Sequence, residues 1–378
     1  MSAGVRHLYV HLPFCGHRCG YCDFVTLVGR RHEHGRYVEA LLRELELERG
    51  LLADEVETVY LGGGTPTFTE PAPLARVLAF LPPAREVTVE ANPETVTPAL
   101  AVALRGCGVT RVSLGAQSFQ PKLLSVLERR AGPENVRRAF YDLRGAGFDN
   151  ISLDLIYGIP GQSTSDLGFD LAEAIALGPE HVSCYELEAK PGTRFTHAYG
   201  DELARQAEEM EGYFEQVVET LTAAGYRWYE TANFCVEGFQ SRHNLAYWLG
   251  RDYLGIGIGA VSTVHGLRWR NAPRLAGYLA ALERGARPPR EVEALDASTR
   301  RRERLMLGLR LDEPVPTTAV EGAVDAEALG RLRRAGLVVR QDGGLTLTRR
   351  GRFLGGGVTA ELFADGEVEI PAKTTIEA

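Results

Sequence analysis

The sequence has no long apolar run. No uncharged apolar stretch of about eighteen or more residues occurs in its 378 residues, which excludes a membrane-spanning helix. The first strand-like segment begins at Arg6, which leaves no room for a cleavable signal peptide before it. Both absences predict a soluble protein in a reducing cytoplasm.

Positive charge and cysteine are also scarce. Lys and Arg number 42 against 50 Asp and Glu, giving a formal net charge of −8. A broad basic surface is therefore not expected, and we predict no nucleic-acid partner. Six cysteines in so long a chain do not form the disulfide framework of a small secreted protein. Three of them stand far apart in apolar surroundings and are predicted to be reduced core residues: Cys107, Cys184 and Cys235.

The other three cysteines fall within one short stretch, His11-Leu-Pro-Phe-Cys15-Gly-His-Arg-Cys19-Gly-Tyr-Cys22-Asp-Phe24. Glycines between them let the chain turn tightly, so three thiolates can point at one place. A cubane iron–sulfur cluster held by three thiolates keeps one iron open for an outside ligand. Zinc held by the three cysteines and His17 or His11 is the alternative, although zinc ligands usually come as two separated pairs.

Strand-like and helix-like segments alternate through the first two thirds of the chain. The predicted strands are residues 6–12, 56–61, 86–90, 109–114, 150–156 and 181–188, and the predicted helices are residues 34–49, 71–81, 97–106, 133–147, 164–177 and 202–224. Such alternation is typical of βαβ units around a parallel sheet. Six units predict an α/β fold with an incomplete (β/α)6 barrel.

A smaller unit is expected after a Pro/Arg-rich break, Arg287-Pro-Pro-Arg290, which we interpret as a linker. Beyond it the pattern predicts helices at residues 298–310 and 325–335. Two short strands follow at residues 336–340 and 344–348, around an Asp342-Gly343 turn. This order predicts a winged-helix-like α+β domain that acts as a lid or packing module, so we divide the chain into residues 1–286 and 287–378.

Polar residues follow several predicted strands of the barrel. Reacting groups of parallel barrels gather at the carboxyl ends of strands, so these residues are expected at one mouth. The glycines of Gly62-Gly-Gly-Thr-Pro66 let a backbone loop approach a zwitterionic amino acid, although such turns often only reverse the chain. Glu90, Gln117 and Asp154 are candidate ligand contacts, with helix capping as the alternative. Arg129 is a candidate partner of a carboxylate or, equally, a solvated helix charge.

The C-x3-C-x2-C spacing resembles the radical S-adenosylmethionine (SAM) superfamily. The resemblance implies a [4Fe-4S] cluster at Cys15, Cys19 and Cys22, with the amino and carboxylate groups of SAM on the open iron. It also implies that the turn at Gly62, Gly63, Gly64 and Thr65 contacts the SAM amino group. Glu90, Gln117 and Asp154 then contact ribose and adenine, and Arg129 pairs with the SAM carboxylate.

Longer motifs resemble the oxygen-independent coproporphyrinogen III oxidase group, which contains oxidases and HemW-type heme chaperones. They are the cysteine stretch, the glycine turn, Leu114-Gly-Ala-Gln-Ser-Phe119 and Asp154-Leu-Ile-Tyr-Gly-Ile-Pro160. The oxidases carry an N-terminal extension and a further cysteine two residues after the third. This sequence has Phe24 at that position and fourteen residues before Cys15. The resemblance therefore favours the chaperones and implies that oxidase activity is lacking.

The chaperone type carries a His-Asn-x-x-Tyr-Trp motif linked to heme, and this sequence has His243-Asn-Leu-Ala-Tyr-Trp248. An imidazole can ligate heme iron, and Tyr and Trp offer flat faces to a porphyrin. His265 and His197 are the alternative ligands. The resemblance implies delivery of heme to apo-cytochromes or other acceptors, a flavodoxin- or ferredoxin-type electron donor, and membrane contact only through the acceptor.

Three other functions are weighed against this one. Radical decarboxylation of coproporphyrinogen III would need a second SAM-shaped pocket and basic residues for the substrate, and no convincing set is found. A tRNA-modifying role would need a basic face, which the C-terminal module lacks. Gly255-Ile-Gly-Ile-Gly259 mimics a dinucleotide fingerprint, but no βαβ unit with a downstream acidic residue surrounds it. We expect these glycines to bring backbone close to adenosine or to seal the barrel.

Overall fold

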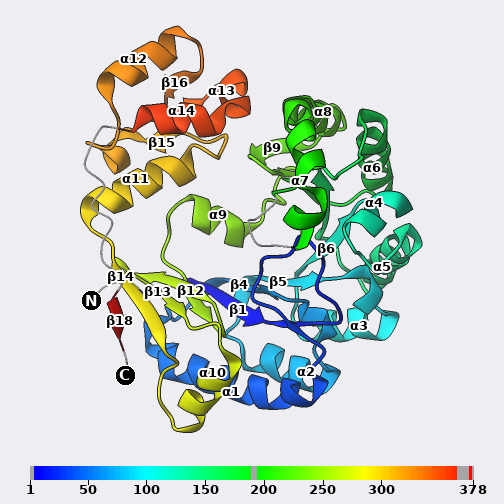
Figure 1. The fold of residues 1–378 in the computed structure, drawn as a ribbon. Helices are drawn as coiled ribbons and strands as arrows, with labels where there is room; N and C mark the ends of the chain where they lie inside the picture. The colour runs from blue at the N-terminus through cyan, green and yellow to red at the C-terminus, as the bar shows by residue number, and fades with distance from the viewer. Residues whose placement is uncertain (1–3, 189–193, 364–373, 377–378) are drawn as a thin grey trace.

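A computed structural model describes residues 4–188, 194–363 and 374–376 (Figure 1). Its largest element is a nine-stranded sheet in the order β11-β1-β4-β5-β6-β7-β8-β10-β9. The strands from β11 to β8 are parallel, whereas β10 and β9 at one edge are antiparallel. In sheet order they are Leu254–Ile256, His7–Leu12, Val56–Gly63, Ala84–Ala91, Arg111–Gln117, Ile151–Tyr157, His181–Glu186, Asn233–Cys235 and Arg227–Glu230.

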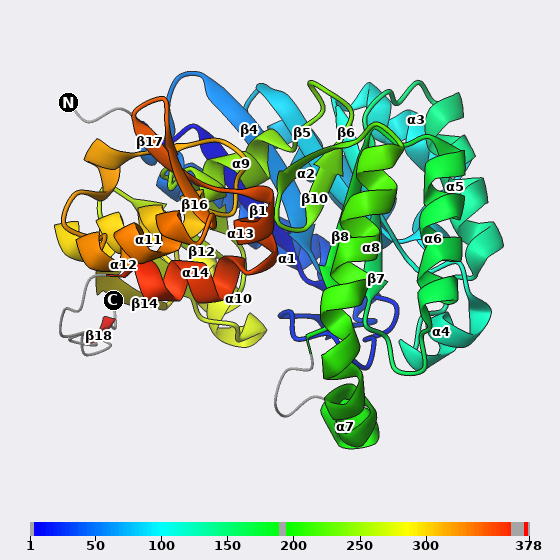
Figure 2. The ribbon, with the colours of Figure 1, turned by 90° about the horizontal axis from the view of Figure 1, so that it is seen from above.

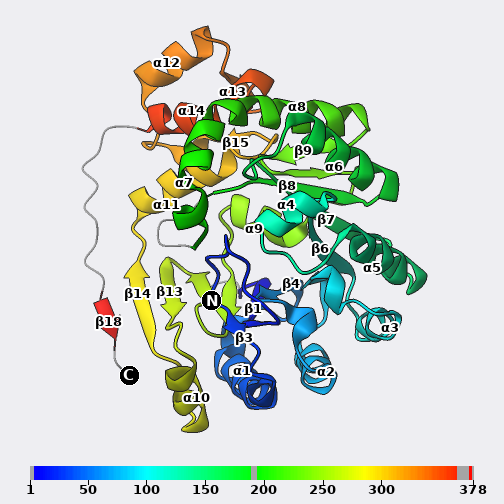
Figure 3. The ribbon, with the colours of Figure 1, turned by 45° about the vertical axis from the view of Figure 1, so that its right-hand side comes forward.

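Helices cover the outer, convex face of this curved sheet (Figures 1 and 3). Six parallel strands are each followed by a helical segment, which confirms the incomplete (β/α)6 barrel. The covering helices are α1 (His34–Glu48), α2 (Pro71–Phe80), α3 (Pro98–Gly106), α4 (Pro121–Val126), α5 (Pro133–Gly145), α6 (Thr164–Leu177) and α8 (Met210–Ala223).

The two faces of the sheet differ in chemistry because successive strand residues point to opposite sides. On β6, Val112, Leu114 and Ala116 belong to the main apolar core beneath the helices. The alternate residues of the same strand, Arg111 and Ser113 among them, line a cavity inside the barrel. The barrel therefore has a polar interior and an apolar outer core.

Glycines close the sheet on the β1 side, where β11 pairs with β1. Gly257 has a φ of 102°, and a Cβ there would lie 2.6 Å from the Tyr37 hydroxyl. A Cβ on Gly255 would collide with the Val261 carbonyl. Only glycine allows this approach, which agrees with a barrel-sealing role for the 255–259 stretch.

Two segment boundaries differ from the sequence prediction. The single helix expected over residues 202–224 is two, α7 (Arg194–Gln206) and α8, joined by a 3₁₀ turn at Ala207–Glu209. The Gln206 side chain donates to the Ile159 carbonyl at 3.0 Å, which holds the break against the end of β7. As a result α8 packs beside α6, while α7 extends past the carboxyl ends of the strands (Figure 2).

The linker expected at 287–290 is also wrong. Arg290 begins β14 (Arg290–Ala294), which pairs with β13 (Leu267–Asn271) in a second sheet that also contains β12 (Val261–Val264) and β18 (Thr374–Ile376). Arg287 and Arg290 donate to the buried carboxylate of Glu48 at 2.8 and 2.6 Å. These ion pairs hold the segment to α1, so the small C-terminal unit begins after β14 rather than at residue 287.

The small unit has its own apolar cluster, which includes Leu305, Leu332 and Leu345. Its turn at Asp342 and Gly343 has φ values of 49° and 74°, which confirms the predicted hairpin. A third strand completes the winged-helix-like sheet. Its elements are α11 (Ala297–Gly308), β15 (Val315–Pro316), α12 (Ala326–Arg334), β16 (Val338–Gln341), β17 (Gly344–Leu347), α13 (Arg349–Phe353) and α14 (Gly355–Leu362).

Two further features of the fold bear on the sequence predictions. Within the described ranges, no helix is both long and apolar enough to cross a membrane. Cys184 and Cys235 are buried as predicted, but Cys107 is exposed. Cys107 caps the carboxyl end of α3, where the chain leaves the helix at the surface.

Candidate functional site

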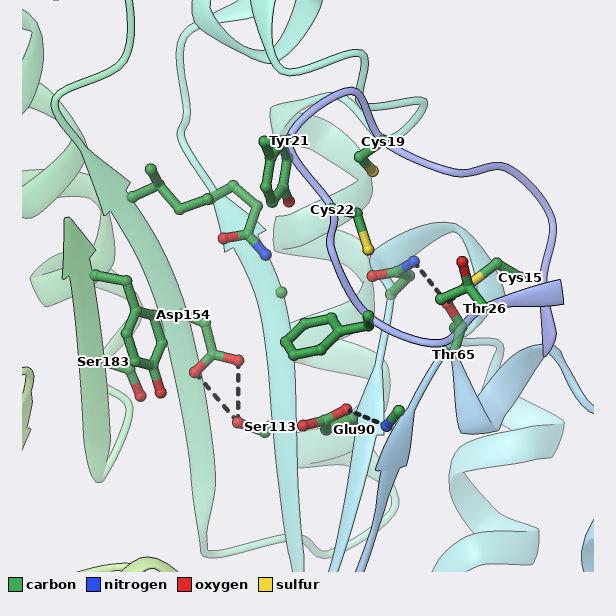
Figure 4. Close-up of a pocket in the computed structure, with 18 of the residues that line it drawn as sticks. Cys15, Cys19, Tyr21, Cys22, Thr26, Thr65, Glu90, Ser113, Asp154 and Ser183 are labelled. Atoms are coloured by element: carbon green, nitrogen blue, oxygen red, sulfur yellow. Dashed lines mark hydrogen bonds between the residues drawn. The ribbon is translucent and has the colours of Figure 1, made fainter. Parts of the chain in front are cut away.

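The three clustered cysteines face one cavity of about 470 Å³ at the carboxyl ends of the parallel strands (Figure 4). Strand β1 delivers the chain into their loop, and β2 (Phe14–Cys15) pairs with β3 (Leu27–Val28) to close it. A backbone hydrogen bond from Cys22 N to Cys19 O, 3.2 Å long, tightens the loop between them. Both loop ends are thus fixed, and the thiols lie between them.

The surroundings of these thiols suit a metal cluster. Burial raises the pKa of the Cys15 thiol to about 11 and also raises the pKa of Cys22. Bound iron would reverse this, because a coordinating thiol loses its proton. Arg129 brings a positive charge to the same place, with its Nη1 3.8 Å from Cys19 Sγ. In the described part of the chain, no group of three or more His, Cys, Asp or Glu side chains is arranged to hold a single metal ion.

The glycine turn lies beside the cysteine loop. Gly63 has a φ of 109°, and a Cβ there would strike the His11 ring, so only glycine fits. Gly63, Gly64 and Thr65 line the cavity, whereas Gly62 does not. Thr65 Oγ1 lies 3.4 Å from Cys15 Sγ, so the turn and the cysteine loop touch.

Two carboxylates stand deeper in the same cavity. Glu90 accepts hydrogen bonds from Tyr60 Oη at 2.8 Å and from Gly63 N at 3.2 Å. Burial nevertheless raises the pKa of Glu90 to about 7, with the negative charge of Asp154 adding to the shift. Burial also raises the pKa of Asp154, whose oxygens accept from Ser113 Oγ at 3.0 and 3.2 Å. Asp154 lies in the middle of β7 rather than at its end, one layer below the position that we expected.

Gln117 and Arg129 complete the predicted set at the mouth. Gln117 has a φ of 66° at a β-bulge between β6 and β7, a backbone distortion typical of functional sites. Arg129 is no solvated helix charge, because its Nη2 donates to the Gly115 carbonyl at 2.8 Å and to Asn92 Oδ1 at 3.0 Å. Asn92 in turn donates to Thr65 at 3.0 Å, linking the arginine to the glycine turn.

His243 lies elsewhere. It belongs to α9 (Arg242–Trp248), which plugs the barrel near the amino-terminal ends of the strands, at the opposite end from the cysteine loop (Figure 2). The ring is fully buried. Its Nδ1 lies 2.7 Å from Thr58 Oγ1, and its Nε2 lies 2.9 Å from Tyr247 Oη. Burial lowers the pKa of His243 to about 3, so the imidazole is neutral. His265 and His197 are exposed and do not line the cavity.

The cavity thus joins all of the predicted site residues except Gly62 and His243. Its lining includes the three cysteines, Gly63, Gly64, Thr65, Glu90, Gln117, Arg129, Asp154 and, from the His-Asn-x-x-Tyr-Trp motif, Asn244. Sequence reasoning missed further lining residues, namely Tyr60, Asn92, Arg111, Ser113, Ser183 and Tyr185. A signal was present, because polar residues recur at every second position of β6, β7 and β8, which a fully buried parallel strand does not require.

Comparison with known proteins identifies related families and folds. The Radical SAM superfamily model matches residues 9–171, and the HemN C-terminal domain model matches residues 295–354. Among solved structures, the coproporphyrinogen III oxidase HemN from Escherichia coli superposes with a TM-score of 0.79 at 24% identity, covering 95% of this chain and 90% of that one. This likeness concerns the fold.

Similarity to curated proteins extends along the chain. The heme chaperone HemW of Mycobacterium tuberculosis (strain ATCC 25618 / H37Rv) is 37% identical over 368 residues, which is 94% of each chain. HemW of Bacillus subtilis (strain 168) is 31% identical over 94% of this chain and 98% of its own. With such identity along nearly the whole of both chains, this protein belongs to the HemW family of heme chaperones, within the radical SAM superfamily.

Proposed function

We propose that this protein is a heme chaperone that binds heme and delivers it to apo-hemoproteins such as respiratory cytochromes. The observation that carries the proposal is the sequence similarity of this chain to a HemW heme chaperone, which is 37% identical over 94% of the chain. The cytoplasm, where cysteines remain reduced, is the compartment that suits it. Membrane contact through the acceptor protein and a flavodoxin- or ferredoxin-type electron donor are parts of the same proposal.

The chain is further proposed to hold a [4Fe-4S] cluster on Cys15, Cys19 and Cys22. When bound, the cluster supplies an open iron and an electron. What supports this is that three thiols from one short loop face a single cavity, with Arg129 beside Cys19. The tight loop would cover one side of a reduced cluster.

SAM is proposed to lie against the glycine turn. Gly63 and Gly64 lie beside the cysteine loop, where their carbonyl oxygens can accept from the ammonium group of an amino acid, because their N–H groups already donate to Glu90 and Leu12. Glu90, Gln117 and Asp154 line the same cavity and can accept or donate to ribose and adenine. Arg129 is fixed by Asn92 and Gly115, so it presents a preset positive charge to a carboxylate.

His243 as the heme ligand stays a prediction that has a structural requirement. Both ring nitrogens are engaged, so ligation of iron through either one would require its bond to Thr58 or to Tyr247 to break and α9 to move. Asn244, its neighbour in the motif, already lines the cavity. Asn244 can therefore contact a bound heme without a movement of α9.

The direct test is heme transfer. Anaerobically reconstituted protein is loaded with heme, freed of excess, and mixed with an apo-cytochrome b, while a parallel sample receives coproporphyrinogen III, SAM and reductant. A chaperone transfers heme to the acceptor and forms no protoporphyrinogen IX. Turnover with SAM consumption, without heme transfer, would contradict the proposal and identify a short oxidase.

A further inference from the structure

Arg111 is the most unusual side chain inside the barrel. It starts β6, is only 1% exposed, and is the largest of the fully buried side chains. Its Nε and Nη1 are buried without a hydrogen-bond partner among the described residues. Buried donors nearly always have a partner, so we expect a bound molecule to supply the acceptor for this guanidinium.

Arg111 is placed where an acceptor can arrive. It lines the same cavity as the cysteines, together with Ser113, Gly115 and Gln117 from its own strand. Six residues of extended strand separate Arg111 from Gln117 at the mouth, or roughly 20 Å. Arg111 therefore forms the floor of a cavity that opens beside the cysteine loop.

Acidic residues on the two neighbouring strands accept their hydrogen bonds from other groups, although the charge of Arg111 offsets part of the rise in pKa of Glu90 and Asp154. The Asp154 carboxylate, on β7, accepts from Ser113 and Ser152. The Glu86 carboxylate, on β5, accepts from the backbone N–H groups of Arg242 and His243 at 3.0 and 3.1 Å, at the start of α9. Each acid thus has its own donors, while Nε and Nη1 of Arg111 have no acceptor in the described part of the chain.

We propose that Arg111 binds a carboxylate of the molecule that the barrel holds, and that this carboxylate is a propionate of the tetrapyrrole. A guanidinium matches a carboxylate with two parallel hydrogen bonds. SAM also carries a carboxylate, but in the proposed function that group lies at the cluster, at the other end of the cavity. A propionate arm is short compared with the depth of the cavity, so the edge of the ring must itself enter the barrel for the carboxylate to meet Arg111. The assignment to heme rests on the proposed function.

Ligand pairs with and without their carboxylate groups test this inference. Heme is compared with heme dimethyl ester, which has no carboxylate, and SAM with decarboxylated SAM, by equilibrium titration of reconstituted protein. The variants are Arg111→Gln and Arg111→Lys, with Arg130→Gln as the matched control, because Arg130 is exposed and does not line the cavity.

Wild type and Arg130→Gln are expected to bind heme at least about tenfold more tightly than its dimethyl ester. Arg111→Gln removes that preference and leaves ester affinity unchanged, and Arg111→Lys restores part of it. If instead the preference for SAM over decarboxylated SAM is lost, the carboxylate belongs to SAM and the propionate assignment is overturned. If Arg111→Gln keeps both preferences, Arg111 is only a structural counter-charge.

Two further results keep the test decisive. If Arg111→Gln does not fold, wild type and Arg111→Lys answer, because equal affinity of wild type for heme and its dimethyl ester, or a preference that is undiminished in Arg111→Lys, overturns the proposal. If wild type binds no heme at all, the heme chaperone proposal fails, and with it the propionate assignment. The SAM pair still reports whether Arg111 recognises a carboxylate.

Discussion

The two ends of the barrel cavity each carry a recognisable sequence motif, but the side chains of the two motifs differ in how many hydrogen bonds they make within the protein. At the mouth, the cysteine loop and the glycine turn present thiols and backbone groups to an open cavity. At the floor, α9 is held by a closed network in which Glu86 binds its first N–H groups and His243 contacts Thr58 and Tyr247. The mouth is therefore arranged for ligands, whereas α9 at the floor chiefly closes the barrel, beside the unpartnered donors of Arg111.

This difference shows that residue type alone does not tell a ligand from a structural part. Cysteines at the mouth have few partners of their own, so a cofactor can bind them without breaking existing hydrogen bonds. A histidine whose two nitrogens are both engaged must lose interactions before it binds iron. The number of internal partners that a side chain has separates the two cases.

Loss of the mouth ligands is the largest expected effect. Replacing Cys15, Cys19 and Cys22 by alanine is expected to reduce bound iron after reconstitution from about four atoms per chain to near zero. Cys107→Ala, at an exposed cysteine, is expected to keep the iron. Iron and sulfide analysis measures both, and an undiminished iron content in the triple variant would show that the cluster does not lie at the mouth.

Damage to the floor is expected to act on stability. His243→Ala removes two buried hydrogen bonds and a ring stacked on Tyr60, so unfolding free energy should fall by about 2–4 kcal/mol. His32→Ala, at an exposed histidine, should change it by less than about 0.5 kcal/mol. Urea unfolding measures the difference. If His243→Ala is as stable as wild type yet loses heme, His243 is a ligand rather than a structural residue.

The smallest expected effect is a pH dependence at the mouth. The folded pKa of Glu90, about 7, lies above the usual value of 4.5, so the folded state holds the proton more strongly. This contribution to stability is present below pH 4.5 and is lost as pH rises to about 7. It amounts to roughly 1–3 kcal/mol. Glu90→Gln should therefore gain stability relative to wild type between about pH 5 and pH 8, and an equal difference at both would contradict the raised pKa.

Much of the mouth was predictable because its residues follow strand ends in a parallel barrel, a position fixed by topology. The cysteine spacing, the glycine turn and the polar residues Glu90 and Gln117 can all be recognised from short stretches of sequence, and the structure places them at the mouth. The position of His243 could not be predicted in this way, because it depends on where the short helix α9 returns after two further strands, β9 and β10. Arg111 fell inside the strand predicted at 109–114 and was missed, since a charged side chain on a strand usually points to solvent.

The boundaries that failed did so for long-range reasons. Arg287-Pro-Pro-Arg290 has the composition of a linker, but both arginines meet Glu48, more than two hundred residues earlier in the chain. The apolar spacing over residues 202–224 suits one helix, yet Gln206 is held by the end of β7. Neither contact leaves a trace in the local pattern.

The most direct test of a cofactor-binding mouth is the electron paramagnetic resonance spectrum of the reduced, reconstituted protein with and without SAM. If the mouth holds a three-thiolate cluster with an open iron beside the glycine turn, adding SAM changes the spectrum of wild type. His243→Ala, at the floor, responds in the same way. A wild-type spectrum that shows a cluster but does not change with SAM would contradict the placement of SAM at the mouth.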